Sequence, residues 1–447
     1  MAKLWGGRFK KRADPQFERF SRSLQWDSHL LPYELRIDLA HVRALKGARV
    51  LTAKEAGRLS SALRSLERGY KTGRLKLDRN AEDVHSAVHS AVAKIAGPLA
   101  EKLHTGRSRN ELVCQGMRLY CLDHARRIAA SLSAIQREWL RLADRNQDVR
   151  IAGRTHWEKA QPVVLSHVFL AYVEMLERSK RAVVFAGESA DVCVLGSGAL
   201  AGSTFALDQK RMARELGLRR IVSNSYDAVG DRGFIFALLG ALQMLGIQLS
   251  RIAEQIMLEK LAPDTAYEIG REFCTGSSMM PQKVNADMLE LTRGASAVFA
   301  ANFAGLSTLM KGTAMSYNRD YQWDKKFLVD SVDTVEELLE VFRRTVSTIS
   351  VDRRAAARQV SDPFLYATDV ADLMVRKGRP FAEAHALVGR YVTESESTGA
   401  PLSDLMKDAR GSFDADRSVR MKKTIGSTHP DRIKAALSDW KKRLRAD

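Results

Sequence analysis

The chain of 447 residues contains little cysteine and little proline, and it has no apolar run long enough to cross a membrane. Four cysteines, Cys114, Cys121, Cys193 and Cys274, are too few to form a disulfide scaffold in a chain of this length, so we expect a reducing, cytoplasmic setting. The basic N-terminus lacks the apolar stretch of a signal peptide. The most apolar segment, 234–249, is shorter than the ~20 residues of a spanning helix. We therefore expect it to be a core helix, with no membrane partner.

Proline is absent from two long stretches, residues 163–262 and 282–362. Because proline breaks the interior of a helix, these gaps permit long helices. Apolar residues between 332 and 349 recur at spacings of three and four, which is typical of one face of a helix. The alternation of apolar and polar residues that is typical of strands never extends beyond a few residues. The sequence therefore predicts an all-α protein.

Glycine, proline and the helical patterns together suggest three regions. Residues 1–105 combine short helices with turns, and residues 106–355 contain the long helical patterns separated by Gly-rich loops. Residues 356–447 contain shorter helices punctuated by Gly and Pro. We expect an N-terminal helical domain, a central long-helix bundle and a small C-terminal helical domain in these ranges.

Acidic residues are outnumbered, with 53 Asp and Glu against 71 Lys and Arg, which gives a formal net charge of +18. Such an excess raises the possibility of a nucleic acid or another polyanion as partner. Much of it lies at the chain ends, because residues 1–12 carry five basic side chains and no acid, and residues 417–447 carry ten against three. Charge at chain ends is readily solvated. We therefore do not expect a nucleic-acid partner.

Two short patterns suggest a nucleotide or a metal, but neither has the context that such a site requires. Residues 196–201 read as GxGxxA, yet a dinucleotide loop requires a preceding strand within a βαβ unit. His85 and His89 are four residues apart and would share one face of a helix. No third metal ligand accompanies them. We expect neither a nucleotide nor a metal.

The segment with the clearest chemistry is 275–285, which reads Thr-Gly-Ser-Ser-Met-Met-Pro-Gln-Lys-Val-Asn. Gly276 and the two serines after it predict a loop with accessible backbone N–H groups. Lys283 and Asn285 add a cation and an amide at the start of a helix. Such a set can bind a carboxylate, and a serine among these groups can exchange a proton. From the residues alone, an ordinary helix-capping loop explains the segment about equally well.

The pattern Gly-Ser-Ser-x-Met-Pro-x-Lys-x-Asn at 276–285 resembles the signature of the fumarase/aspartase superfamily. At position 282 the chain has Gln, where fumarases and aspartases usually have Gly. In this respect the signature resembles that of the argininosuccinate lyase branch. Further segments resemble the same branch along nearly the whole chain: 4–9, 21–27, 82–85, 103–110, 155–156, 195–202, 224–232, 317–325 and 367–381.

This resemblance implies an all-α homotetramer of three-domain subunits, built around a central bundle of long helices, in which each active site draws on three subunits. It implies the reversible elimination of argininosuccinate to arginine and fumarate, in arginine biosynthesis, without a cofactor or a metal. Removal of a carbon-bound proton beside a carboxylate creates a dianionic aci-carboxylate. Preorganised hydrogen-bond donors stabilise such charge best.

The resemblance also assigns roles by position. It implies that Ser277 is the general base and His156 the proton donor, although which of the two is base and which acid stays open. Lys283 would stabilise the charged carboxylate, and Glu290 would orient His156. Substrate binding would fall to side chains with cationic, amide or hydroxyl groups, namely Ser23, Arg109, Asn110, Thr155, Asn285, Tyr317, Gln322 and Lys325.

Residues beside the expected catalytic His156, and one in the segment 317–325, differ from the family pattern. Arg154 replaces a usual Tyr, residues 157–159 read Trp-Glu-Lys in place of Leu-Gln-Arg, and Trp323 replaces a usual acid. These differences leave open a related fumarate-releasing lyase that acts on another N-substituted aspartate. The net charge of +18 suggests a second alternative, a structural or polyanion-binding protein on the same scaffold. The intact Ser277, His156, Lys283 and Glu290 argue against that alternative.

Overall fold

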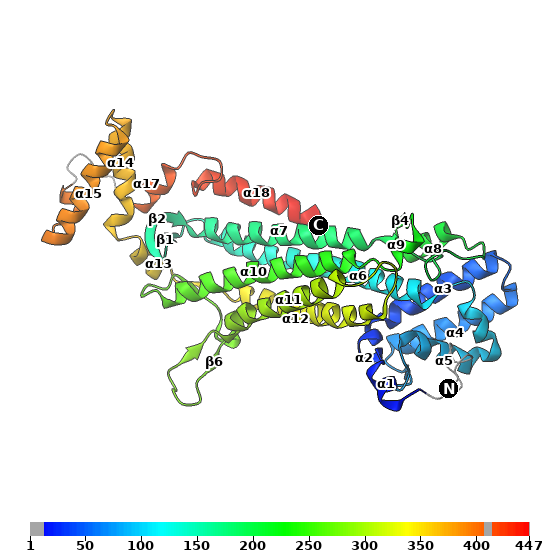
Figure 1. Ribbon diagram of the computed structural model, residues 1–447. Coiled ribbons are helices and arrows are strands. Elements are labelled where there is room, and N and C mark those ends of the chain that lie inside the picture. The colour runs from blue at the N-terminus through cyan, green and yellow to red at the C-terminus, as the bar shows by residue number, and fades with distance from the viewer. Residues whose placement is uncertain (1–12, 406–413, 447) are drawn as a thin grey trace. The chain divides into compact units, whose positions relative to one another are not determined.

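The computed structural model describes residues 13–405 and 414–446 (Figure 1). Most of these residues are helical, which confirms the all-α prediction. The segment 4–9, which resembles the family's N-terminal motif, lies outside the described residues.

The α-helices are, in chain order, α1 Pro15–Phe20, α2 Leu24–Asp27, α3 Leu31–Gly47, α4 Ala53–Lys71, α5 Val84–Ala96, α6 Arg109–Arg145, α7 Leu165–Ala190, α8 Gln209–Leu216, α9 Ser225–Ala228, α10 Gly233–Leu261, α11 Asp287–Lys311, α12 Asp324–Ser347, α13 Arg353–Gln359, α14 Ala367–Arg376, α15 Phe381–Thr398, α16 Leu402–Leu405, α17 Ala415–Arg420 and α18 Pro430–Ala446. Among the described residues, five short 3₁₀ helices join them: η1 Ser28–Leu30, η2 Gly97–His104, η3 Arg271–Phe273, η4 Arg319–Trp323 and η5 Pro363–Tyr366.

The strands in the described part of the chain are short and form four two-stranded sheets. Three pairs are antiparallel and one, β3 with β4, is parallel. Their bounds are β1 Arg150–Thr155 with β2 Glu158–Val164, β3 Val192–Cys193 with β4 Arg220–Ile221, β5 Tyr267–Glu268 with β8 Ser350–Val351, and β6 Thr275–Gly276 with β7 Val284–Asn285.

Helices α7, α10, α11 and α12 lie in the two stretches that lack proline, whereas α6 lies before them, between Pro98 and Pro162. Helix α6 has 37 residues and α10 has 29, and the apolar face expected between 332 and 349 lies mostly on α12. On that face Val332, Val335 and Phe342 are fully buried, as the spacing predicts. Within the described ranges α10 alone has the length and composition of a membrane span, and half of its most apolar stretch is buried in the fold.

The chain divides into two compact units, each described here by itself. Unit 1 comprises residues 1–129, 181–244 and 297–336, and unit 2 comprises 130–180, 245–296 and 337–447. The three domains expected from the sequence remain a prediction.

The N-terminal helices of unit 1 form a packed group that carries one wall of the site described below. Helix α3 packs against α4, α5 and α8, and its Ile37, Val42 and Leu45 are fully buried. Helix α5 begins at Asp83, whose carboxylate accepts a hydrogen bond from the backbone N–H of Ser86 at 2.7 Å. Such a cap satisfies an N–H group that has no partner within the helix. The cap also fixes Asp83 at the end of α5.

Unit 2 supports the β1–β2 hairpin on both of its strands. Helix α13 packs on β1, and α17 and η5 pack on β2. The backbone N–H of Ala152 donates to the Gln359 side chain at 3.3 Å, and that of Val164 donates to Thr428 Oγ1 at 2.8 Å. These contacts satisfy strand N–H groups that would otherwise be buried without an acceptor. The hairpin stem is therefore an integral part of unit 2.

Candidate active site

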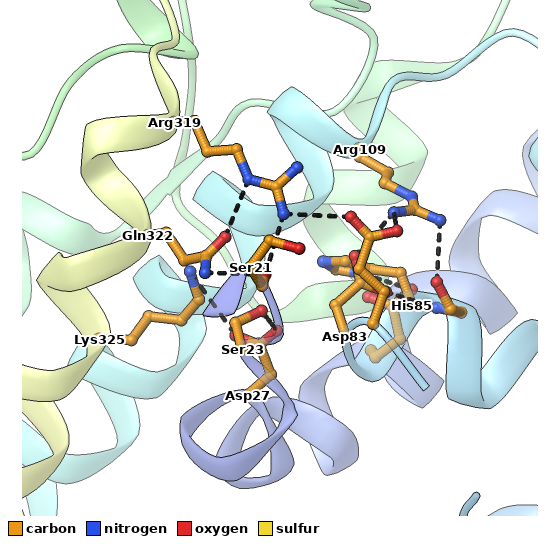
Figure 2. A network of polar contacts seen from close by, with 12 residues as sticks. Ser21, Ser23, Asp27, Asp83, His85, Arg109, Arg319, Gln322 and Lys325 are labelled. Atoms are coloured by element: carbon orange, nitrogen blue, oxygen red, sulfur yellow. Dashed lines mark hydrogen bonds and ion pairs between the residues drawn. The ribbon is translucent and has the colours of Figure 1, made fainter. Parts of the chain in front are cut away.

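A cavity of about 630 Å³ in unit 1 is lined mainly by charged and polar side chains. A volume of this size fits a small organic substrate. Six residues predicted to bind substrate line it: Ser23, Arg109, Asn110, Tyr317, Gln322 and Lys325. Figure 2 shows four of them, Ser23, Arg109, Gln322 and Lys325, joined to their neighbours by hydrogen bonds and ion pairs.

Ser23 and Asp27 lie one helical turn apart and form one end of this network (Figure 2). The Ser23 hydroxyl donates to Asp27 Oδ2 at 2.5 Å, and Asp27 Oδ1 lies 3.6 Å from Lys325 Nζ. Burial raises the pKa of Asp27, although Lys325 and the Ser23 hydrogen bond oppose this effect. Asp27 ends the segment 21–27 that resembles the family, but it is not among the predicted site residues.

Lys325 is a buried cation that faces the cavity. Its side chain is 4% exposed, and its Nζ lies 3.6 Å from Asp27 and 3.9 Å from Asp324. Burial alone would lower the pKa of Lys325, but these two carboxylates outweigh it and raise the pKa above its usual value. Asp324 in turn is paired at 2.5 Å with the fully buried Arg232. Lys325 therefore stays charged and can bind a substrate carboxylate.

Arg109, the first residue of α6, forms the opposite wall of the network. Its guanidinium donates to Asp83 Oδ2 at 2.8 Å and to Ser86 Oγ at 2.9 Å. Burial opposes the charge on Asp83, but His85 and Arg109 outweigh it, so the pKa of Asp83 is lowered. The next residue, Asn110, donates to the carbonyl of Ala199 at 3.1 Å. The cap of α5 therefore also orients the guanidinium at the cavity.

His85 also lines the cavity, although the sequence had suggested only a discounted metal role for it. Its Nδ1 lies 2.9 Å from Glu34 Oε1, and both side chains are buried. Burial disfavours the charged imidazolium, but the Glu34 carboxylate outweighs it and the pKa of His85 rises to about 9. His85 is therefore a cation at neutral pH. The Glu-Asp-x-His match at 82–85 was the signal that could have identified it as a site residue.

Arg319 and Gln322 on η4 hold the third side of the cavity. Arg319 donates to Glu82 Oε1 at 3.1 Å and to the Gln322 side chain at 3.2 Å, while both side chains donate to the carbonyl of Ser21 at 3.0 Å. Burial raises the pKa of Tyr317, so its phenol stays protonated. Arg319 lies inside a segment that matches the family pattern, but it too was absent from the predicted set.

The other six predicted residues lie in unit 2 rather than at this cavity. They are at the hairpin tip, in the β6–β7 loop and in the first turn of α11, namely Thr155, His156, Ser277, Lys283, Asn285 and Glu290. Ser277 and Asn285 are half-buried, and the remaining four are exposed.

The loop between β6 and β7 holds Ser277 with its oxygen against two backbone amides. Strand pairing of Gly276 with Val284 closes the loop. The N–H groups of Met279 and Met280 lie 3.2 and 3.0 Å from Ser277 Oγ, which accepts from both. Amide donors aimed at an oxygen stabilise negative charge on it. Two such donors therefore converge on the Ser277 oxygen.

His156 lies at the tip of the β1–β2 hairpin. Thr155 pairs with Glu158, so His156 and Trp157 form a two-residue turn, and their φ angles are 50° and 73°. Within the described part of unit 2, His156 makes no hydrogen bond or ion pair with Glu290. The orienting role expected for Glu290 therefore remains a prediction.

Two family models match the chain. The model described as "Lyase" matches residues 7–300, and the model described as "Argininosuccinate lyase C-terminal" matches residues 364–431.

Curated relatives are similar over the whole chain. An argininosuccinate lyase of Desulforudis audaxviator (strain MP104C) is 37% identical and covers 99% of this chain and of its own length. One of Pelotomaculum thermopropionicum is 36% identical over 100% of this chain and 99% of that protein. One of Bacillus subtilis (strain 168) is 38% identical over 91% of this chain and 88% of that protein.

Solved structures share the fold. EDDS lyase in complex with formate superposes with a TM-score of 0.81 at 23% identity, over 98% of this chain and 91% of that one. A class II fumarase from Schistosoma mansoni gives a TM-score of 0.75 at 15% identity, over 90% of this chain and 89% of that one.

Proposed function

This chain belongs to the argininosuccinate lyase family of the fumarase/aspartase superfamily, and from that premise we propose how its residues perform the reaction. The chain is a carbon–nitrogen lyase that cleaves argininosuccinate to arginine and fumarate. The alternative substrate, another N-substituted aspartate, is not favoured, because relatives that match over nearly the full length are argininosuccinate lyases.

The observation that carries this function is the charge of the unit 1 cavity. Argininosuccinate presents three carboxylates, an amino group and a guanidinium. Lys325, His85 and Arg109 supply cations for the carboxylates, and Asp27 and Glu82 supply acids for the cationic groups. Such mixed charge suits a small zwitterionic polyacid better than a uniformly charged polymer.

The proposed reaction begins when Ser277, as alkoxide, removes a proton from the carbon beside a succinate carboxylate. The electron pair of that C–H bond moves onto the carboxylate and gives the dianionic aci-carboxylate. Lys283 and Asn285 bind this dianion, and the two amides at Ser277 Oγ lower the cost of the alkoxide. The electrons then return to form the C=C bond of fumarate. The C–N bond breaks as His156 donates a proton to the leaving nitrogen.

The proposed assembly is a cytoplasmic homotetramer in which one copy's unit 2 completes another copy's cavity. Supporting this, the proton-transfer residues and the substrate-binding residues lie in different units, and His156 and Lys283 are exposed. Large apolar side chains on the long helices are also exposed, namely Phe185, Ile247 and Leu291 at 65%, 48% and 67%. These side chains are available for burial between copies. In a symmetric assembly, every copy buries the same surfaces against its neighbours.

Incubation of the purified protein with argininosuccinate tests the function directly. We expect fumarate and arginine to appear in equal amounts, followed by the ultraviolet absorbance of fumarate and by amino-acid analysis. Fumarate released only from a different N-substituted aspartate would show that the amine half is assigned wrongly. No release from either substrate, with salt-sensitive binding of a polyanion, would favour the non-enzymatic alternative.

A further inference from the structure

The tip of the β1–β2 hairpin places a tryptophan directly beside the proposed proton donor. Both tip residues, His156 and Trp157, have positive φ angles of 50° and 73°, the combination found in type I′ turns. Such turns strongly prefer Asn and Gly, because larger side chains are strained at positive φ. A bulky pair at this position therefore costs stability. Strain of this kind is typically retained at functional sites.

The tip is held in place despite its strain. The Arg154 guanidinium donates to the carbonyl of Trp157 at 3.4 Å across the turn. Lys159 Nζ, on the adjoining strand, lies 3.7 Å from Asp362 Oδ2. Below them the stem is buried, with Ile151 and Ala152 each 4% exposed. Trp157 is thus a large side chain on a supported, preorganised turn.

The indole of Trp157 is 70% exposed, so unit 2 does not use it for packing. A tryptophan that packs into a core would stabilise a protein by several kcal/mol (~3–5). An exposed tryptophan on a strained turn contributes no such stabilisation. Its aromatic face is, however, the best side-chain partner for a flat or compact cation within about 6 Å of the ring centre. Its exposed indole is therefore available to a cationic ligand bound at this tip.

We propose that Trp157 is a specificity-determining residue that stacks on the guanidinium of the substrate's amine half. The inference rests on the proposed function, in which His156 protonates the leaving nitrogen. That nitrogen belongs to the guanidinium, and the next Cα along the chain is only ~3.8 Å from that of His156. When the tip brings His156 to this nitrogen, the indole is near enough to stack on the same planar cation.

The reverse reaction separates the two halves of the substrate, because arginine and fumarate are then varied independently. Replacing Trp157 by Leu, which the family usually carries at this position, is expected to raise the KM for arginine by about 3–30-fold. The KM for fumarate should change less than about twofold, since the fumarate half does not contact the ring. Trp157→Phe should retain most of the affinity for arginine. The neighbouring Glu158→Gln should leave both constants unchanged.

An unchanged KM for arginine in Trp157→Leu, or an equal rise in both KM values, would overturn the proposal. Thermal melting and the oligomeric state of each variant show whether the hairpin has folded. If the leucine variant has not, Trp157→Asn provides the answer, because Asn tolerates the positive φ and also removes the aromatic face. Failure of the proposed function is distinguishable, because the wild-type protein would then form no argininosuccinate at all. A wild-type protein that is active but indifferent to Trp157→Leu rejects only the role of the tryptophan.

Discussion

Replacing Ser277 by alanine is expected to lower kcat by about 10²–10⁴-fold, the usual contribution of a positioned acid or base. The substitution removes the oxygen on which the N–H groups of Met279 and Met280 converge. Because binding depends mainly on the unit 1 cavity, KM for argininosuccinate should change far less than kcat. Steady-state kinetics of fumarate release measures both constants.

Ser278 provides the matched control for this prediction. It is the same residue type in the same loop, it is exposed, and it has no proposed role in the reaction. Ser278→Ala should therefore retain kcat within a few-fold. Near-normal turnover in Ser277→Ala, or an equal loss in both variants, would remove Ser277 from the mechanism.

Replacing Lys325 by methionine is expected to lower kcat/KM by about 10²–10³-fold, since the loss of one partner from a buried charge pair costs 2–5 kcal/mol. Lys325 is buried and lies between Asp27 and Asp324. Methionine keeps the length of the stem but leaves Asp27 without its cation, whereas Asp324 keeps its pair with Arg232. The cavity then repels a substrate carboxylate instead of attracting it.

Lys326 offers the corresponding control, because it is the adjacent lysine on α12 and is exposed. Lys326→Met should leave kcat/KM within about twofold, as surface charges contribute little. Thermal melting of both variants separates lost affinity from lost folding. If Lys325→Met were folded and retained full kcat/KM, the unit 1 cavity would not be the substrate site.

The long helices could be predicted from the sequence because proline and apolar spacing act locally. The proline-free stretches and the three-and-four spacing on α12 depend only on neighbouring residues. The β1–β2 hairpin was not predicted. Its turn contains His156 and Trp157 instead of the Asn-Gly or Asp-Gly that signals such a turn, and its second strand includes Pro162, which usually argues against a strand. Tertiary support from α13 and α17 stabilises it instead.

The site could be predicted only in part, because some of its features depend on the tertiary fold and not on neighbouring residues. Motif residues such as Arg109 and Lys325 could be assigned by position in the sequence. The charge state of His85 could not, because it depends on Glu34, which lies 51 positions earlier in the chain and meets it only through packing of α3 on α5. Asp27 likewise gains its role from Lys325, nearly 300 residues later. Such pairs are set by the tertiary fold and leave no local pattern.

The most direct measurement of the shared active site is the activity of tetramers that contain both Ser277→Ala and Lys325→Met subunits. Co-expression with two different tags isolates the mixed assemblies, and each variant alone provides the baseline. If unit 2 of one copy completes the cavity of another, some sites combine an intact Ser277 with an intact Lys325, and random assembly from equal amounts restores about a quarter of the wild-type activity. Mixed tetramers no more active than the two separate variants would contradict a site shared between subunits.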